Sequence, residues 1–179
     1  MLEIEVCRTF SMPPEKRREV LDMCNAAFGQ PFEALFDILP PDGTHLLGRE
    51  DGRLVAHLVI TDRWMRPEGG PTLRVAYIDA LATDADFRHR GHAGLLLKTA
   101  SDLCAVRYDV LALSTDLPDL YARYGFVKWH GRLLLEKETG TGTDFSPEQG
   151  KLMIRVSNMS LIPDFTKSMT ANWRPGGGF

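Results

Sequence analysis

The sequence predicts an α+β fold with a mixed, mostly antiparallel central sheet and one βαβ unit. Three observations indicate this class. Segments typical of strands and helices follow one another in the order β-α-α-β-β-β-α-β-α-β-β, no internal repeat is present, and one helical segment connects two strand-like segments in the middle of the chain. The chain has 179 residues, of which 44% are hydrophobic and 25% are charged, as in ordinary globular proteins. We therefore expect a single domain over residues 1–179.

The first quarter of the chain predicts one strand and two helices. Residues 2–8 alternate apolar and polar side chains, which is typical of a half-buried strand. Ser11, the double proline that follows it and Glu15 are typical of a helix start, and apolar residues at helical spacing continue this helix to about Gly29. A second short helix is expected over residues 32–39, ending at a Pro-Pro-Asp-Gly turn.

The middle of the chain predicts three strands. Residues 45–49 and 54–62 form two apolar runs joined by Glu-Asp-Gly, and an Asp-Gly step between such runs is a strong indication of a hairpin. A turn rich in proline and glycine at residues 67–71 then leads into a long strand-like run over residues 72–83.

The second half of the chain predicts the βαβ unit and the last strands. Residues 91–106 carry apolar side chains at helical spacing, and the apolar run 110–113 follows as a short strand. A brief helix stopped by a glycine is expected over residues 116–124. Two more strands, separated by a polar loop, are expected over residues 127–135 and 152–156.

Charge and hydropathy exclude several classes of partner. Lys and Arg number 21 against 24 Asp and Glu, a net charge of −3, so the basic excess of a nucleic-acid-binding domain is missing. The sequence has no run of about 18 apolar residues, which excludes a transmembrane helix. Glu3 and Glu5 stand where a signal peptide has basic and apolar residues. We therefore expect a cytoplasmic protein with no nucleic-acid partner and no membrane partner.

The cysteines and histidines do not predict a metal site. Cys7, Cys24 and Cys104 are odd in number and far apart, without a Cys-x-x-Cys pair. The five histidines are dispersed along the chain, so no set of four converging zinc ligands is visible as a motif. We expect three reduced, buried thiols and no metal.

The stretch from Asp79 to Gly94 carries the clearest chemical indication. A strand runs into a loop of basic and small residues, and a helix begins immediately afterwards. The first amides of that helix have no partner inside it and lie at the positive end of its dipole, while Arg88 and Arg90 add charge and Gly91 leaves room. The segment is therefore typical of a pyrophosphate site, or of a solvated basic turn that caps a helix.

Two segments resemble a known enzyme family. Arg88-His-Arg-Gly-His-Ala93 resembles the R/Q-x-x-G-x-G/A signature of the GCN5-related N-acetyltransferase (GNAT) family, and Leu120-Tyr-Ala-Arg-Tyr-Gly-Phe126 resembles the Y-x-x-x-G-F segment of that family. The two segments stand in the family's order and at its separation. The resemblance implies the GNAT fold, acetyl-CoA as co-substrate and no metal. It implies co-substrate binding by Leu81, Ala82, Thr83, Arg88, His89, Arg90, Gly91, His92 and Ala93.

Other segments resemble one group within this family, the aminoglycoside 2′-N-acetyltransferases. These segments are Tyr77-Ile-Asp-Ala, Leu113-Ser-Thr, Trp129-His-Gly131 and the tail from Asp164 to Phe179. The resemblance implies that Tyr121 donates a proton to the leaving sulfur and that Asp79 accepts a proton from the substrate amine through water. It also suggests a homodimer.

The residues at the expected acceptor site differ from those of that group. Its members line the site with carboxylates, whereas this chain has Pro31, Phe36 and Gly177 at three such positions. Glu148 is an acid that remains. The acceptor is therefore an aminoglycoside or, as the lost acids favour, a less charged amine. The resemblance implies acceptor contacts from Asp79, Ala80, Ser114, Glu148, Phe36 and Phe179.

The sequence thus predicts an acetyl-CoA-dependent N-acetyltransferase that acts on a primary amine of a small molecule. The alternative is a CoA-binding regulatory or interaction module without turnover. The presence of Tyr121 and Asp79 favours the enzyme, because a module without turnover does not need an acid and a base.

Overall fold

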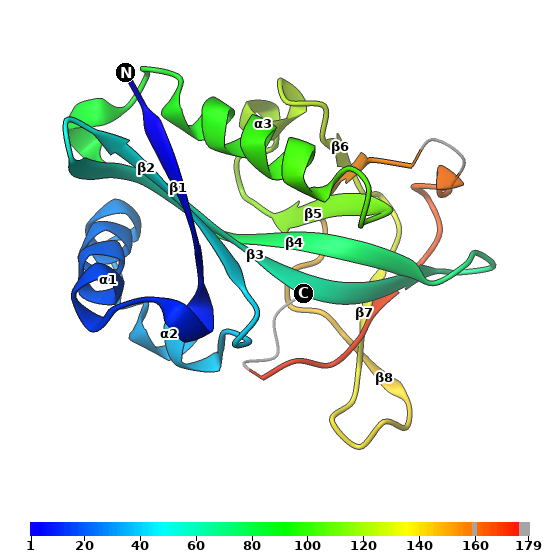
Figure 1. Cartoon of the computed structure of the whole chain (residues 1–179). Helices are drawn as coiled ribbons and strands as arrows, with labels where there is room; N and C mark the ends of the chain where they lie inside the picture. The colour runs from blue at the N-terminus through cyan, green and yellow to red at the C-terminus, as the bar shows by residue number, and fades with distance from the viewer. Residues whose placement is uncertain (159–160, 176–179) are drawn as a thin grey trace. The chain divides into compact units, whose positions relative to one another are not determined.

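The computed structural model describes residues 1–158 and 161–175 (Figure 1). The elements in chain order are β1 (Glu3–Arg8), η1 (Thr9–Ser11), α1 (Pro14–Phe28), α2 (Glu33–Ile38), β2 (Thr44–Glu50), β3 (Arg53–Pro67), β4 (Leu73–Thr83), η2 (Ala85–Phe87), α3 (His92–Cys104), β5 (Val110–Ser114), α4 (Pro118–Ala122), β6 (Val127–Lys128), β7 (Leu133–Glu136), β8 (Thr143–Phe145), β9 (Leu152–Val156) and β10 (Met169–Ala171).

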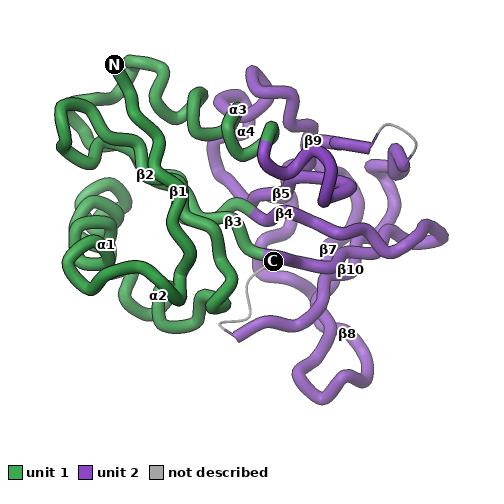
Figure 2. The backbone as a smooth tube through the Cα atoms, viewed as in Figure 1, with its two compact units in different colours: residues 1–61, 78–102 green, residues 62–77, 103–179 purple. Residues whose placement is uncertain are grey.

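The chain forms two compact units (Figure 2). Unit 1 contains residues 1–61 and 78–102, and unit 2 contains residues 62–77 and 103–179. Strands β3 and β4 and helix α3 each contribute residues to both units. The expectation of one domain over the whole chain stays a prediction.

Unit 1 is built on the hairpin of β2 and β3. Asp51 and Gly52 connect the two strands with φ angles of 51° and 80°, which are the two left-handed positions that a type I′ turn requires. Strand β1 pairs antiparallel with β2, and α1 and α2 pack against the same face of these strands (Figure 1). The predicted strands and hairpin are confirmed. The core under the two helices consists of Val20, Leu21, Met23, Cys24, Phe36, Leu39, Leu47, Leu54, Val59 and Ala82.

Helix α1 begins and ends at residues suited to those positions. Its first residue is Pro14, and proline is suited there because a first helical residue needs no N–H bond. The helix ends at Gly29, whose φ of 67° is left-handed and whose N–H donates to the Asn25 carbonyl over 2.9 Å. The predicted helix is confirmed, although Ser11 belongs to η1 and does not cap α1. Within residues 1–158 and 161–175, no helix is both long and apolar enough to cross a membrane.

Unit 2 contains a mixed sheet with the strand order β6-β9-β5-β4-β3-β10-β7-β8. Strand β4 runs parallel to β5, and β10 runs parallel to β7. The pairs β5–β9, β6–β9, β7–β8 and β10–β3 are antiparallel. The parallel strands β4 and β5, connected through α3, are the predicted βαβ unit. The predicted α+β class with a mostly antiparallel sheet is therefore confirmed.

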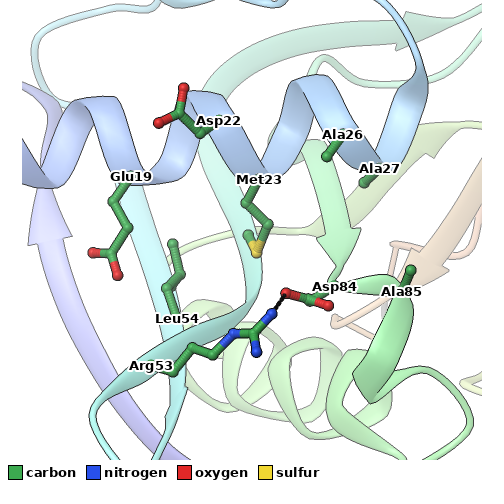
Figure 3. Close-up of a pocket in the computed structure, with 9 residues that line it drawn as sticks. All are labelled: Glu19, Asp22, Met23, Ala26, Ala27, Arg53, Leu54, Asp84 and Ala85. Atoms are coloured by element: carbon green, nitrogen blue, oxygen red, sulfur yellow. Dashed lines mark hydrogen bonds and ion pairs between the residues drawn. The ribbon is translucent and has the colours of Figure 1, made fainter.

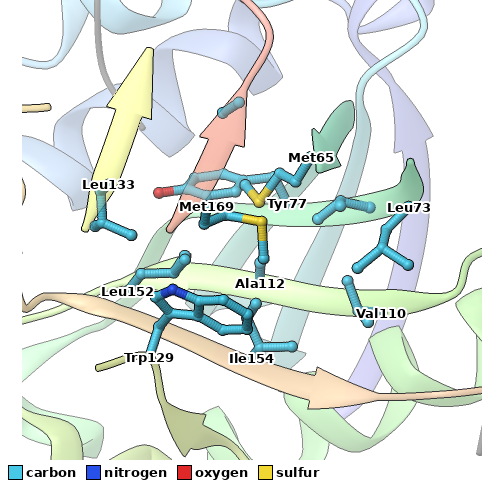
Figure 4. Close-up of a cluster of buried hydrophobic side chains, with 12 residues drawn as sticks. Met65, Leu73, Tyr77, Val110, Ala112, Trp129, Leu133, Leu152, Ile154 and Met169 are labelled. Atoms are coloured by element: carbon cyan, nitrogen blue, oxygen red, sulfur yellow. The ribbon is translucent and has the colours of Figure 1, made fainter. Parts of the chain in front are cut away.

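The core of unit 2 gathers around Trp129, whose side chain is 1% exposed. Figure 4 shows the indole lying between Leu152 and Ile154. Because a buried indole N–H needs an acceptor, its Nε1 donates to the Lys167 carbonyl over 2.9 Å. The full cluster consists of Met65, Leu73, Val75, Tyr77, Val110, Ala112, Trp129, Leu133, Leu152, Ile154, Met169 and Ala171.

The three cysteines are free thiols. Burial raises the pKa of Cys24 to about 12 and that of Cys104 to about 11, so both thiols stay protonated at neutral pH. Cys7 is only half-buried, so the expectation of three buried thiols is wrong for this residue.

The expectation of one strand over residues 127–135 is wrong. The structure has the two strands β6 and β7, because another segment of unit 2 crosses the chain between them. The N–H groups of His130 and Gly131 donate to the Phe165 carbonyl over 2.8 and 3.2 Å. They are therefore not available for hydrogen bonds to a neighbouring strand. Strands β8 and β10 are not among the predicted elements, and β10 lies between β3 and β7.

Gly131→Ala tests this crossing. A Cβ at residue 131 would lie 1.7 Å from the Lys167 carbonyl oxygen, so the crossing backbone would have to move. We expect the free energy of unfolding to fall by about 3 kcal/mol or more, the upper end for an overpacked site. Melting followed by circular dichroism would show this as a fall in Tm of about 2–4 °C per kcal/mol.

The matched control is Gly140→Ala. There a Cβ meets nothing within 4 Å, and the only cost is a left-handed backbone at φ 72°. We expect that cost to be about 1–2 kcal/mol. A loss of stability at Gly131 no larger than the loss at Gly140 would contradict the crossing.

Candidate active site

The loop between β4 and α3 is held at its start by Asp84. The Asp84 carboxylate accepts a hydrogen bond from the Asp86 N–H over 3.0 Å and forms an ion pair with Arg53 at 2.6 Å. Figure 3 shows this ion pair at the side of a cavity of about 390 Å³, bordered above by α1. The cavity is lined by Glu19, Asp22, Met23, Ala26, Ala27, Arg53, Leu54, Asp84 and Ala85, none of which is a predicted site residue.

The end of this loop is an open helix terminus. His89 and Gly91 have left-handed φ angles of 64° and 84°. The Leu95 N–H donates to the Gly91 carbonyl over 3.1 Å, which makes Gly91 the residue that precedes α3. The amides of the first turn that follow have no acceptor inside the helix. A Cβ at Gly91 would meet nothing within 4 Å, so the space beside this terminus is open.

The charge at the terminus is positive. Arg88, His89 and Arg90 are exposed, and they stand beside the N-terminal end of the helix dipole. This combination of free amides, open space and cationic side chains is suited to an anion of the phosphate class.

His92 differs from the other loop residues because its side chain is 6% exposed. Its Nε2 lies 3.3 Å from Oε2 of Glu50, and Arg90 lies 3.8 Å from the same oxygen. The ring therefore supports the loop from inside unit 1. The group that His92 can offer to a ligand at the helix terminus is its backbone N–H.

The second half of β4 carries the next predicted residues. Asp79 is half-buried, and its Oδ2 accepts a hydrogen bond from the Thr61 hydroxyl over 3.4 Å. Ala80 has a left-handed φ of 50° within the strand, a strained conformation that costs a non-glycine residue about 1–3 kcal/mol and often occurs at functional sites. Of the expected co-substrate residues that follow, Ala82 packs in the core, whereas Leu81 and Thr83 are half-buried.

Tyr121 lies on α4 in unit 2. Its ring meets the Phe126 ring edge-on, with centroids 6.1 Å apart at 79°. Burial raises the pKa of the Tyr121 hydroxyl above its ordinary value of 10.0, and a hydrogen bond with Thr115 opposes that shift without cancelling it. The hydroxyl is therefore protonated at neutral pH, as a proton donor must be.

Ser114 lies at the end of β5 and accepts a hydrogen bond from the Tyr77 hydroxyl over 3.0 Å. The Tyr77 ring is buried, and the guanidinium groups of Arg63 and Arg174 lie 5.6 and 5.0 Å from its centroid. Arg63 also donates to the Asn172 carbonyl over 2.7 Å. Sequence reasoning missed this grouping, because no spacing connects Arg63 with Arg174.

Glu148 stands in the turn before β9. Its N–H donates to the Ser146 hydroxyl over 3.1 Å. Its Oε2 is buried, and among the described residues it has no hydrogen-bond partner. An unpaired buried carboxylate oxygen is costly, so this oxygen is suited to a cationic partner.

Phe36 lies in the core of unit 1 and is 5% exposed. Its ring centroid is 5.8 Å from that of His45 and 5.9 Å from that of His57. Sequence reasoning missed these two histidines, whose signal was a polar residue inside each of two apolar strands. Phe179 and Gly177 lie outside the described residues.

The predicted residues divide between the units. Unit 1 brings together the half-buried Asp79, the strained Ala80, the backbone that follows them and the loop before α3. Unit 2 contains Tyr121, Ser114 and Glu148.

Comparisons with known proteins show the family and support the fold. The model of the acetyltransferase (GNAT) family matches residues 8–128. An aminoglycoside 2′-N-acetyltransferase from Mycolicibacterium fortuitum is 25% identical over 139 residues, which cover 75% of this chain and 70% of that protein. YhbS, a GNAT family protein from Escherichia coli solved in complex with CoA, has a TM-score of 0.68 at 17% identity, with 94% of this chain and 88% of that chain covered. Escherichia coli ElaA has a TM-score of 0.60 at 17% identity, with 87% and 99% covered. Because the family model matches well over half of its length, this chain belongs to the GNAT family of acetyltransferases.

Proposed function

We propose that this protein is an acetyl-CoA-dependent N-acetyltransferase for a primary amine of a small molecule. The observation that carries the proposal is the open, positively charged terminus of α3 in a chain of this family. The YhbS structure, which contains CoA, and the named activity of the Mycolicibacterium fortuitum relative support the same class of reaction.

The residues at this terminus fit a pyrophosphate. The Gly91 position is open on the side where a Cβ would stand, and the first-turn amides need an acceptor. Arg88 and Arg90 supply charge, and the backbone of Leu81 to Thr83 would pair with the amides of the pantetheine arm as a strand does. Acetyl-CoA supplies an acetyl group activated as a thioester, so the transfer forms a C–N bond and breaks the C–S bond.

Asp79 is the proposed base. An amine must lose a proton during the transfer, and a carboxylate accepts it directly or through one water. The Thr61 hydroxyl holds one carboxylate oxygen, which restricts the side chain to one direction. Because aspartate is one carbon shorter than glutamate, a bridging water is the expected route.

Tyr121 is the proposed acid. It holds its proton at Oη because burial raises the pKa of the hydroxyl. The ordinary pKa values of a tyrosine and an aliphatic thiol lie within about two units of each other, so a proton can pass from Oη to the thiolate as the C–S bond breaks. The raised pKa makes Tyr121 a weaker acid than free tyrosine but keeps its proton in place until that step. The contacts with Phe126 and Thr115 fix the ring and the hydroxyl.

The proposed acceptor carries a positive charge that Glu148 pairs, because the buried Oε2 of this residue needs a donor. Asp79, Ala80 and Ser114 are further proposed acceptor contacts. Phe36, also predicted as a contact, is buried against His45 and His57 and offers an acceptor little surface. Pro31 and Phe36 replace acids of the resembling group, so we propose an acceptor with fewer charges than an aminoglycoside.

A thiol-release assay with acetyl-CoA and a panel of amino sugars, amino acids and polyamines tests this function. We expect turnover of one class of amine. Glu148→Gln should lower kcat/KM for that amine by about 10- to 150-fold, because one charge-assisted hydrogen bond contributes about 1.5–3 kcal/mol.

Asp144→Asn is the control, because Asp144 is an exposed acid paired with Lys137 at 3.4 Å. Equal losses in the two variants would contradict a specific role for Glu148. Binding of CoA without turnover of any amine would overturn the proposed transfer and favour a regulatory module.

A further inference from the structure

Two histidines meet in the core of unit 1. His45 on β2 and His57 on β3 are 1% and 0% exposed. In the antiparallel register His45 pairs with Val59, and Leu47 pairs with His57, so the two histidine side chains are diagonal neighbours on one face. Nδ1 of His45 and Nε2 of His57 lie 2.9 Å apart.

The partners of the two rings determine where their protons lie. Nδ1 of His57 lies 3.0 Å from the Ala80 carbonyl oxygen, which can only accept, so His57 carries its proton on Nδ1. A neutral imidazole has one donor and one acceptor, so Nε2 of His57 accepts from Nδ1 of His45. Nε2 of His45 then accepts from the Thr9 hydroxyl, 3.1 Å away. The Gly43 carbonyl lies 3.3 Å from the same hydroxyl, but it already accepts from the Thr9 N–H over 2.9 Å, so the hydroxyl proton is assigned to His45.

The surroundings keep both rings neutral. Burial lowers the pKa of His45 to about 4 and, together with the neighbouring His45, lowers the pKa of His57 to about 3. The groups packed against the rings are the Phe36 ring and the Cys24 thiol, whose Sγ lies 3.7 Å from Nδ1 of His57. Burial raises the pKa of this thiol, so it is uncharged. Each hydrogen bond in the chain from Thr9 to Ala80 thus has one donor and one acceptor.

The chain of hydrogen bonds ends on the strained peptide of β4. In a trans peptide the C=O and the following N–H point in opposite directions. The bond from His57 to the Ala80 carbonyl therefore also sets the direction of the Leu81 N–H, which points away from the helix-covered core. Asp79 precedes the same peptide and is held by Thr61, which lies on the same strand as His57.

We propose that His57, oriented by His45 and Thr9, is a positioning residue for the acetyl transfer: its bond to the Ala80 carbonyl holds the left-handed backbone between Asp79 and Leu81. The inference rests on the proposed function, in which Asp79 is the base and Leu81 begins the backbone that binds the co-substrate. Without this bond the strained peptide can rotate, and the groups on both sides of it move. The larger consequence falls on the chemical step, because Asp79 moves while the proposed phosphate site at the α3 terminus is unchanged. The displaced Leu81 N–H weakens acetyl-CoA binding to a smaller extent.

The first test measures the proton positions and needs no activity. Long-range ¹H–¹⁵N NMR of the histidine rings should show two neutral Nδ1–H tautomers at pH 7, with unchanged shifts down to pH 5. The His57 signals are assigned by their loss in His57→Asn. A neutral Nε2–H tautomer or a cationic ring at His57 would overturn the inference, whether or not the protein turns over an amine.

The second test compares two substitutions at residue 57. His57→Asn keeps an N–H donor at the Nδ1 position, whereas His57→Leu removes it with an apolar side chain. We expect His57→Leu to lower kcat by about tenfold or more, with a smaller rise in KM for acetyl-CoA, because displacement of a reacting group acts mainly on the chemical step. His57→Asn should restore most of kcat.

The control is His130→Asn, an exposed histidine of unit 2, which should leave kcat unchanged. A folded His57→Leu protein with wild-type kcat would overturn the inference, as would equal losses in the Leu and Asn variants. If His57→Leu does not fold, Thr9→Val removes only the donor to Nε2 of His45. Both rings should then keep their Nδ1–H tautomers, and a change of the His57 tautomer in that variant would overturn the inference. A wild-type protein that turns over no amine refutes the proposed function instead, and the NMR result still decides the hydrogen-bond chain.

Discussion

Gly91→Glu is expected to abolish the thermal stabilisation that CoA gives to the wild-type protein. At a ligand concentration 100 times Kd, binding to the native state stabilises by about 2.7 kcal/mol, which raises Tm by about 5–11 °C for a chain of this length. The Gly91 position is open where a Cβ would stand, so a glutamate there puts a carboxylate at the proposed anion-binding end of α3. The loss of two charge-assisted hydrogen bonds weakens binding by about 10²- to 10⁴-fold.

The control for this variant is Gly140→Glu. Gly91 and Gly140 have φ angles of 84° and 72°, and a Cβ at either position meets nothing within 4 Å. The two variants thus share the backbone strain and the added charge. They differ in that only Gly91 lies at the proposed phosphate site. Isothermal titration calorimetry and melting curves with CoA should show binding in Gly140→Glu alone. A normal CoA shift in folded Gly91→Glu would refute the placement of the phosphates.

Tyr121→Phe is expected to lower kcat by about 10²-fold, the low end for loss of a general acid, with little change in CoA affinity. The substitution removes one hydroxyl and keeps the ring that packs edge-on against Phe126. Tyr124→Phe, three residues further along in the turn after α4, removes a hydroxyl from the next tyrosine and should leave kcat near wild type. Equal kcat in wild type and Tyr121→Phe would mean that the proton for sulfur comes from solvent or another group.

The pH profile of kcat provides a second test of Tyr121 as the acid. The pKa of its hydroxyl is raised above 10, so the acid form persists through the alkaline range and is lost only as the pH rises through that higher value. We therefore expect kcat to show no alkaline fall between about pH 7 and 9.5 in the wild-type protein. An alkaline limb centred near pH 8 would identify a different acid.

Most elements follow from local sequence. The left-handed pair Asp51-Gly52 makes the hairpin of β2 and β3, Pro14 and Gly29 bound α1, and the run before Arg88 becomes β4. The glycine before α3 is also a local property, because a small residue at a helix start does not itself cover the first amides. The structure shows that no other segment fills the Cβ position there. The motif at residues 88–93 predicted the helix terminus, and together with the segment at residues 120–126 it predicted the family.

Other features depend on contacts between residues far apart in the chain, and these only the tertiary structure decided. Strand β10 has three residues and takes its place from backbone bonds to β3 and β7, so no local pattern marks it. The sequence predicts Phe36 as an acceptor contact, whereas the structure buries its ring against His45 and His57. The sequence by itself determined the fold class and the family, because these depend on periodicity and on residues adjacent in the chain. The phosphate-binding role of the loop stays a prediction. The bend at Ala80 and the two histidines behind it were decided by tertiary structure, because a buried polar ring must find its partners wherever the packed strands place them.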